Sequence, residues 1–149
     1  AAGNAAGRIN TDRIAARHEL GSAMQFAVID KRSNTLVGSC LLFNLDEANE
    51  HVEVGYVLGK AHWGNGYMRE AVTALIDYAF DRLGMRRVEA VADPRNTASD
   101  RLLTSLGFTR EGLLRQRWMR NGEMQDGCYY GLLRHEWPPA AKTGHTSRP

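Results

Sequence analysis

Alternating apolar and polar residues predict three strands in the first half of this chain. Residues 25–29, 36–43 and 52–58 are apolar or alternating over the length of a strand, and the polar segment 31–34 predicts a loop. A polar connection at 46–50 leads into the third strand. Alternation along this strand puts its side chains on two faces. One face carries Val52, Val54, Tyr56 and Leu58, and the other carries Glu53, Gly55 and Val57.

A spacing of about 3.6 residues between apolar positions predicts a helix over residues 68–83. Gly84 is a natural C-terminal stop for it. The apolar stripe consists of Met68, Ala71, Val72, Leu75, Ile76, Ala79 and Leu83. A weaker helical pattern covers residues 11–20.

A strand–helix pair follows this helix. Residues 88–92 form a short apolar strand, and a second helix is predicted at 97–106. Asn96 or Thr97 can cap its start, and Gly107 ends it.

The last two strands are predicted at 108–118 and 123–133. Asn121-Gly122 between them is a strong two-residue hairpin signal, because both positions tolerate positive φ. The whole order of elements implies an α/β fold with a mixed sheet and helices packed on it. We expect a single domain over residues 1–137, and a disordered tail at 138–149 because this segment has few apolar groups.

Composition is that of a globular protein. The chain has 149 residues, 43% of them hydrophobic and 24% charged, which is enough to bury a core. A net charge of +2 argues against a dedicated nucleic-acid binder. Cys40 and Cys128 lie far apart in apolar runs, which favours buried free thiols over a disulfide or a metal site. No apolar run approaches the ~20 residues of a membrane span and no secretory signal is visible, so we expect a cytoplasmic protein.

The segment His62-Trp63-Gly64-Asn65-Gly66-Tyr67 is the most informative in the chain. It lies between a predicted strand and a predicted helix. A helix N-terminus presents unpaired backbone N–H groups and the positive end of the helix dipole. Two glycines remove the side chains that would keep a phosphate at a distance. The segment therefore predicts a binding site for a phosphorylated cofactor.

Several motifs extend this pattern along the chain. They are Glu53-Val54-Gly55-Tyr56, Trp63-Gly64-Asn65-Gly66-Tyr67-Met68-Arg69-Glu70-Ala71, Asn96-Thr97-Ala98-Ser99, Leu106-Gly107-Phe108, Glu111-Gly112 and Leu132-Leu133-Arg134-His135-Glu136-Trp137. In this order and at these spacings, over roughly residues 24–137, the chain resembles the Gcn5-related N-acetyltransferases (GNAT), of the branch that acetylates ribosomal-protein N-termini. The resemblance implies a GNAT-type acyl-CoA N-acyltransferase fold, acetyl-CoA as donor, an amine as acceptor, and no metal.

The resemblance also implies which residues bind the donor. Backbone N–H groups of the glycine loop would hold the pyrophosphate, and these belong to Gly64, Asn65, Gly66, Tyr67 and Met68. The family's loop usually begins with Gln or Arg three residues before the first glycine, where this chain has Ala61.

The preceding strand would bind the rest of the donor. The pantetheine arm would pair with the backbone of Tyr56, Val57 and Leu58, at a bulge that splays two parallel strands apart. A backbone N–H there would polarise the thioester carbonyl.

Glu53 is our candidate general base. A lone carboxylate in an otherwise apolar strand is costly unless it is exposed, paired or used. An ammonium acceptor must lose a proton before it attacks, and Glu53 would take that proton through water. The alternative is a strand-edge glutamate that faces solvent.

Ser99 and Asn96 lie one turn apart on the second helix. In the related ribosomal-protein acetyltransferases a serine at this place is proposed to protonate the leaving thiolate, so Ser99 inherits that role. Many family members use a tyrosine in this helix where the chain has Leu103. Asn96 would hydrogen-bond the pantetheine amides. The alternatives are a serine that only binds backbone and an asparagine that only caps the helix.

Other polar and aromatic residues have weaker claims. Trp63 and Tyr67 would pack either on the cofactor or in the core, and His62 is either a base or, as we expect, a solvated loop residue. Arg101 would reach the 3′-phosphate of the cofactor or face water, and Glu70 suits the helix dipole. Arg115, Arg117 and Arg120 form a basic run that either attracts an acidic acceptor or is a solvated strand face.

Family members normally begin with another strand and helix, for which residues 1–23 offer only a partial N-terminal region. An exposed strand edge would then favour association with a second copy of the chain. A non-catalytic acyl-CoA sensor is the alternative to an enzyme, and a generic nucleotide-binding protein is weaker because the P-loop lysine is absent. The acceptor remains open among a peptide N-terminus, a polyamine, an aminoglycoside and an amino acid.

Overall fold

A computed structural model of the protein describes residues 23–137. The helix predicted at 11–20 and the tail predicted at 138–149 lie outside the described residues. The chain divides into two compact units, Ala1–Met85 and Arg86–Pro149. A single domain over 1–137 remains a prediction.

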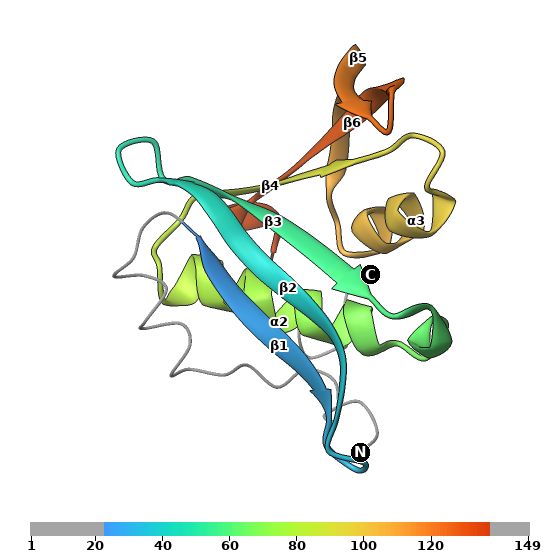
Figure 1. Cartoon of the computed structure of the whole chain (residues 1–149). Helices are drawn as coiled ribbons and strands as arrows, with labels where there is room; N and C mark the ends of the chain where they lie inside the picture. The colour runs from blue at the N-terminus through green and yellow to red at the C-terminus, as the bar shows by residue number, and fades with distance from the viewer. Residues whose placement is uncertain (1–22, 138–149) are drawn as a thin grey trace. The chain divides into compact units, whose positions relative to one another are not determined.

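Three antiparallel strands form the sheet of the first unit (Figure 1). They are β1 (Met24–Asp30), β2 (Thr35–Asp46) and β3 (His51–Leu58). All three predicted strands are confirmed, and β2 is four residues longer than expected, three of them at its C-terminal end. Its pairing with β3 shifts between Phe43 and Asp46, where Asn44 has a φ of 53°. This irregularity carries the strand on to Asp46, which had been expected to open the polar connection.

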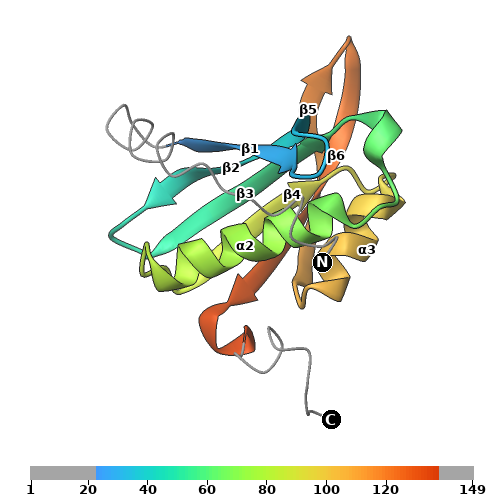
Figure 2. The same ribbon diagram turned by 90° about the horizontal axis from the view of Figure 1, so that it is seen from below.

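Helix α2 (Tyr67–Asp81) packs along one face of this sheet (Figure 2). Its buried side chains are Met68, Ala71, Val72, Leu75, Ile76, Ala79 and Phe80. The predicted stripe is therefore confirmed except at its end. Leu83 lies beyond the helix, whose C-cap is Arg82, and Phe80 fills the last buried position instead. Gly84 has a φ of 72° and turns the chain away.

Phe80→Ala should destabilise the protein far more than Leu83→Ala. Phe80 is 2% exposed, so its truncation leaves a cavity and should cost about 3–5 kcal/mol of unfolding free energy. Leu83 is half-buried outside the helix, so its truncation should cost only about 1 kcal/mol of unfolding free energy. Urea denaturation of both variants measures the difference. Equal losses would mean that Leu83 is packed as tightly as Phe80, which contradicts its half-buried position.

In the second unit, β6 (Glu123–Leu133) pairs antiparallel with both β4 (Arg87–Ala92) and β5 (Thr109–Arg120). Asn121 and Gly122 have φ values of 53° and 77°, which confirms the predicted hairpin turn. The 3₁₀ turn η3 (Arg134–Glu136) follows β6.

Helix α3 (Thr97–Ser105) belongs to the second unit, and both of its ends follow the sequence prediction. The Asn96 side chain accepts a hydrogen bond from the Ser99 amide at 3.0 Å and so caps the start. At the other end Gly107 has a φ of 100°, and the Phe108 amide donates to the Leu103 carbonyl at 3.0 Å. This is the Schellman arrangement, which stops a helix at a glycine.

Both cysteines, Cys40 and Cys128, are buried free thiols, as predicted. Burial raises the pKa of the Cys40 thiol to about 12, so this group stays protonated at neutral pH. None of the helices in the described part of the chain is long and apolar enough to cross a membrane.

Candidate functional site

The glycine loop adopts the conformation that its sequence requires. Gly64 and Gly66 have φ values of 81° and 77°, a region that other residues rarely adopt. A Cβ atom built on either glycine would meet nothing within 4 Å. Gly66 is also the N-cap of α2, and no side chain caps this helix. The two glycines therefore expose the start of α2 to whatever approaches the loop.

The backbone amides of this loop are not used by any residue in the described part of the chain. Among the described residues, no backbone carbonyl or side chain accepts a hydrogen bond from the amides of residues 64–68. The next bond along the helix is from the Glu70 amide to the Gly66 carbonyl, at 3.1 Å. Free N–H groups at the positive end of a 15-residue helix suit a phosphate or diphosphate. The loop thus fits the diphosphate of a coenzyme.

Two aromatic side chains hold the loop against the sheet. The Trp63 indole donates to the Leu58 carbonyl at 2.9 Å, and the Tyr67 hydroxyl donates to the Asp30 carboxylate at 2.8 Å. Trp63 is nevertheless 60% exposed, so it is not a core residue. Asp30 was not identified from the sequence, because nothing in its strand-end position distinguishes it from an ordinary turn residue.

Tyr67→Phe should lower the free energy of unfolding more at pH 6 than at pH 3. The Tyr67 hydroxyl lowers the pKa of Asp30. A lowered carboxyl pKa contributes stability above the ordinary value of about 4 and loses it as pH falls through the folded-state pKa. Wild type and variant should therefore converge in acid. Urea denaturation at both pH values measures this, with Tyr78→Phe as control because the Tyr78 hydroxyl makes no hydrogen bond with any residue of the range 23–137. A difference that stays constant with pH would contradict the assignment.

Glu53 lies on the face of β3 that α2 does not cover. The predicted alternation is confirmed where Val52 and Val54 are buried at 0% and 2% exposure while Glu53 is half-buried. The side-chain NH₂ of Asn44 donates a hydrogen bond to the Glu53 carboxylate at 3.1 Å. Asn44 reaches it from the irregular part of β2. Glu53 is therefore held in place, which differs from a glutamate that simply faces solvent.

Sequence reasoning missed Asn44. The available signal was a polar residue inside the apolar run Leu41-Leu42-Phe43-Asn44-Leu45, of a type that tolerates positive φ. Such a residue indicates an irregular strand, but not which side chain it will contact.

The strand backbone expected to bind pantetheine is regular on one side. Pairing of β2 with β3 is continuous from Gly38 opposite Leu58 to Phe43 opposite Glu53. The bulge at residues 56–58 was expected between parallel strands, so this antiparallel edge does not test it and it stays a prediction. The Leu58 carbonyl is engaged by Trp63, and the Val57 side chain is 67% exposed.

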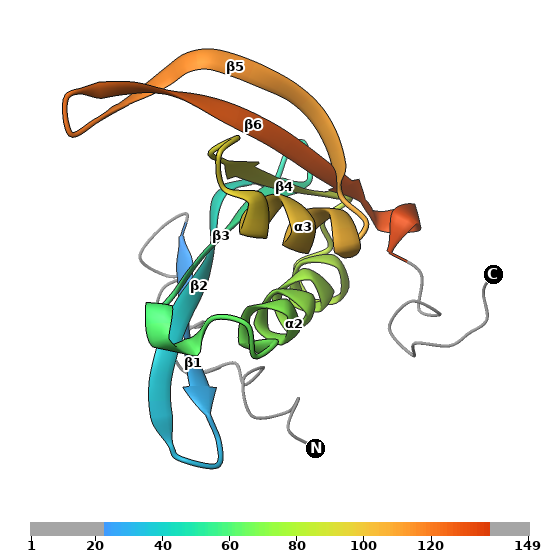
Figure 3. The same cartoon turned by 90° about the vertical axis from the view of Figure 1, so that its right-hand side faces the viewer.

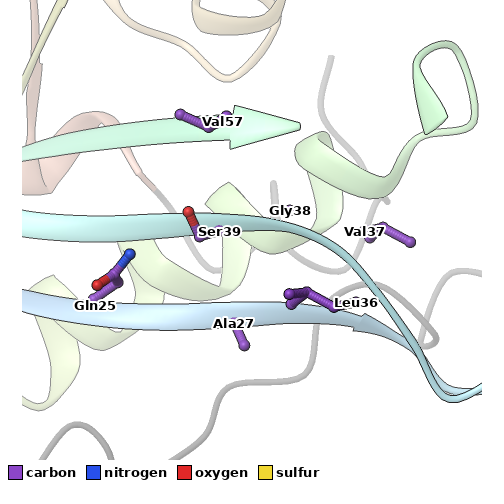
Figure 4. A pocket seen from close by; sticks show the side chains of 7 residues that line it. All are labelled: Gln25, Ala27, Leu36, Val37, Gly38, Ser39 and Val57. Carbon is purple, nitrogen blue, oxygen red and sulfur yellow. The ribbon is translucent and has the colours of Figure 1, made fainter. Parts of the chain in front are cut away.

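A shallow hollow of about 400 Å³ opens on this face of the first unit (Figure 4). Ala27, Ser39 and Val57 lie in register across the three strands and form part of its lining. A Cβ on Gly38 would collide with the Val57 carbonyl, so only glycine fits there. Of the residues predicted from sequence to form the site, Val57 alone lines this hollow.

In the second unit, Asn96 and Ser99 lie together at the start of α3. The helix-capping alternative for Asn96 is confirmed, since its side-chain oxygen accepts the Ser99 amide. No residue of the described chain accepts a hydrogen bond from its side-chain NH₂. Ser99 is 7% exposed, the one buried polar residue of the described chain. Leu103 is fully buried, so the position where many relatives carry a tyrosine is part of the core.

Comparison with known proteins identifies the family of this chain. The model of the acetyltransferase (GNAT) domain matches residues 3–109 of this chain. The chain belongs to the GNAT acetyltransferase family. Its GNAT-type fold, a mixed α/β arrangement of strands and flanking helices, is thereby confirmed as predicted. A solved ribosomal-protein-S5-alanine acetyltransferase from Vibrio fischeri matches with a TM-score of 0.76 and 30% identity, over 84% of this chain and 69% of that one.

Two curated GNAT relatives are also similar. The chain is 42% identical to the uncharacterized N-acetyltransferase p20 of Bacillus licheniformis, over 78% of this chain and 66% of that protein. It is 31% identical to the [ribosomal protein uS5]-alanine N-acetyltransferase of Escherichia coli, over 82% of this chain and 63% of that protein. The chain thus spans about two thirds of the length of these relatives.

The other residues considered as site candidates in this GNAT chain make few contacts. The His62 and Tyr67 rings lie edge to face with their centroids 6.0 Å apart. Arg101 is exposed on α3. No group of three or more His, Cys, Asp or Glu residues that could hold a metal occurs within residues 23–137.

Proposed function

We propose that this protein is an N-acetyltransferase that moves the acetyl group of acetyl-CoA to a primary amine. The observation that supports this most directly is the row of unused backbone amides at residues 64–68, beside two glycines of positive φ. In this proposal these amides bind the diphosphate of the coenzyme. Backbone groups of Tyr56 and Val57 bind the pantetheine arm, with the NH₂ of Asn96 as a further donor to it.

Glu53 supplies the proton acceptor. At neutral pH most of the acceptor amine is protonated, and an ammonium has no lone pair with which to attack. The Glu53 carboxylate takes one proton from it, directly or through water. The neutral amine then forms a bond to the thioester carbonyl carbon as the carbon–sulfur bond breaks. The departing thiolate takes up a proton, for which Ser99 is the proposed donor, and the second proton that the acylated nitrogen loses replaces the one given by Ser99.

A peptide N-terminus is the acceptor that we favour. The relatives from Escherichia coli and Vibrio fischeri are named as acetyltransferases of a ribosomal-protein alanine. Such a substrate would place the protein in the cytoplasm, as the sequence led us to expect.

Acetyl-dependent thiol release tests this function. The protein would be incubated with acetyl-CoA and, separately, a peptide with an N-terminal alanine, spermidine, an aminoglycoside and free amino acids. Free thiol should appear with the peptide, and mass spectrometry should place the acetyl group on its N-terminus. Release only with spermidine or an aminoglycoside would replace the peptide by that acceptor.

An acyl-CoA sensor is the second candidate. The buried Leu103, at the place where many GNAT enzymes carry a tyrosine, favours it. Tight acetyl-CoA binding in calorimetry, without thiol release for any amine in the panel, would establish this alternative and reject the enzyme.

A further inference from the structure

The β5–β6 hairpin of the second unit carries an unusually exposed strand. Figure 3 shows it as a long, curved ribbon of two strands. Of the 12 residues of β5, 10 are exposed, whereas β6 has buried positions. In the described part of the chain β5 pairs with β6 alone. A row of its backbone N–H and C=O groups therefore remains open to another strand.

Apolar side chains are concentrated on this hairpin. Eight large hydrophobic residues are exposed in the described part of the chain, and five of them lie on this hairpin. One is Leu133 at the end of β6, and the other four are Leu113, Leu114, Met119 and Met124, with 44–65% of their surface exposed. Clustered exposed apolar groups of this kind mark interaction sites more often than scattered ones do.

A hydrogen-bonded bulge shapes the middle of the strand. Leu114 lies opposite Gly127 and Trp118 opposite Gln125, so three residues of β5 face one residue of β6. The Gln116 amide donates to the Asp126 carboxylate at 2.7 Å. The Arg117 guanidinium donates to the Tyr129 hydroxyl at 3.0 Å. These bonds give the bulge a defined geometry, and they fix the position of a guanidinium.

The charge of this strand is strongly positive. Four arginines and Glu111 give β5 a formal charge of +3, and Glu111 is already paired with Arg87 at 2.7 Å. Arg115, Arg117 and Arg120 form no ion pair with any residue of the described chain. The carboxylates of Glu123 and Asp126 lie on the neighbouring strand, but Asp126 accepts the Gln116 amide. Arg115 and Arg117 at the bulge therefore have no acidic partner among residues 23–137.

A second copy of this strand does not suit the surface. Pairing β5 with itself would bring two strands of formal charge +3 together. Like charges directly opposite each other are destabilising in sheets. The homo-oligomer expected from sequence would have to use another edge, such as β1, which pairs only with β2 in the described part.

We propose that the outer edge of β5, residues 113–120, is a docking surface for an extended acidic peptide segment with apolar residues at alternate positions. The segment adds a strand beside β5. Its carboxylates pair with Arg115 and Arg117, and its apolar side chains cover Leu113 and Met119. This binding mode uses main-chain bonds for affinity and side chains for selectivity. It requires no acetyl transfer.

A short peptide of alternating glutamate and valine, acetylated at its N-terminus and labelled at its C-terminus, is the probe. The acetyl cap prevents it from acting as an acceptor amine. Fluorescence anisotropy should show binding that weakens with salt, and none for the same peptide with lysine in place of glutamate. Arg115→Glu/Arg117→Glu should raise the Kd about tenfold or more. Arg82→Glu/Arg101→Glu changes the net charge equally and should leave the Kd unchanged.

Hydrogen exchange locates the bound peptide. Amides of residues 113–120 should become protected when the glutamate–valine peptide binds to the wild-type protein. Circular dichroism of both double variants checks that they fold, and Arg115→Gln gives a milder loss if the charge reversal does not fold. The proposal is overturned if the acidic peptide does not bind, if both double variants weaken it equally, or if protection appears elsewhere. Protection of β5 at high protein concentration without peptide would assign this edge to a second copy instead.

Discussion

Gly64→Val is expected to weaken acetyl-CoA binding about a hundredfold or more, which corresponds to ~2.7 kcal/mol. The loop offers its main-chain amides because no side chain stands in front of them. A Cβ at residue 64 meets no protein atom within 4 Å, so a valine there would project into the space that the diphosphate needs. The substitution therefore acts on the ligand and not on the packing of the protein. Isothermal calorimetry with acetyl-CoA and with CoA measures it.

The control for this variant is Gly84→Val, near the other end of α2. Gly84 has a φ of 72°, close to the 81° of Gly64, and a Cβ there also meets open space. Both substitutions should impose a similar backbone strain, roughly 1–3 kcal/mol in each case. Only Gly64→Val should lose acetyl-CoA. Equal affinities in the two variants would show that the glycine loop does not hold the coenzyme, and the proposed function would lose its main support.

The positions of the strands and helices follow closely from local patterns. Alternation predicts β3, the period of 3.6 predicts α2, and Asn121-Gly122 predicts the last hairpin turn. These are short-range effects, which a sequence shows directly. The error at Leu83 has the same origin, because a periodic stripe does not say where the helix stops. There the chain left the helix at Arg82, before the glycine that was expected to end it.

Contacts between distant residues could not be predicted in this way. Tyr67 and Asp30 are 37 residues apart, and their hydrogen bond depends on the start of α2 lying beside the end of β1. Asn44 reaches Glu53 only because β2 is irregular at that point. No sequence pattern predicts the bulge around Gln116, which has a φ of 52°. The backbone cradle of the site was thus predictable from glycine positions, whereas the side chains that position it were not.

Glu53→Gln should lower kcat/KM about a hundredfold near neutral pH and leave acetyl-CoA affinity unchanged. Glutamine has the size of glutamate and an oxygen that can still accept the Asn44 amide, so the local structure should persist. It cannot take up a proton in the pH range of the assay. The variant can then use only the fraction of acceptor that is already neutral. A peptide N-terminus has a pKa near 8, so that fraction rises about tenfold per pH unit below it.

The pH profile is therefore the decisive measurement. The deficit of Glu53→Gln relative to wild type should be greatest in mild acid and should shrink as the pH passes about 8. Glu47→Gln is a suitable control, since Glu47 is an exposed carboxylate in the turn between β2 and β3. It should reproduce the wild-type profile. If Glu53→Gln instead runs parallel to wild type at every pH, Glu53 takes no part in proton transfer. Its bond to Asn44 then serves only to bury a strand carboxylate at low cost.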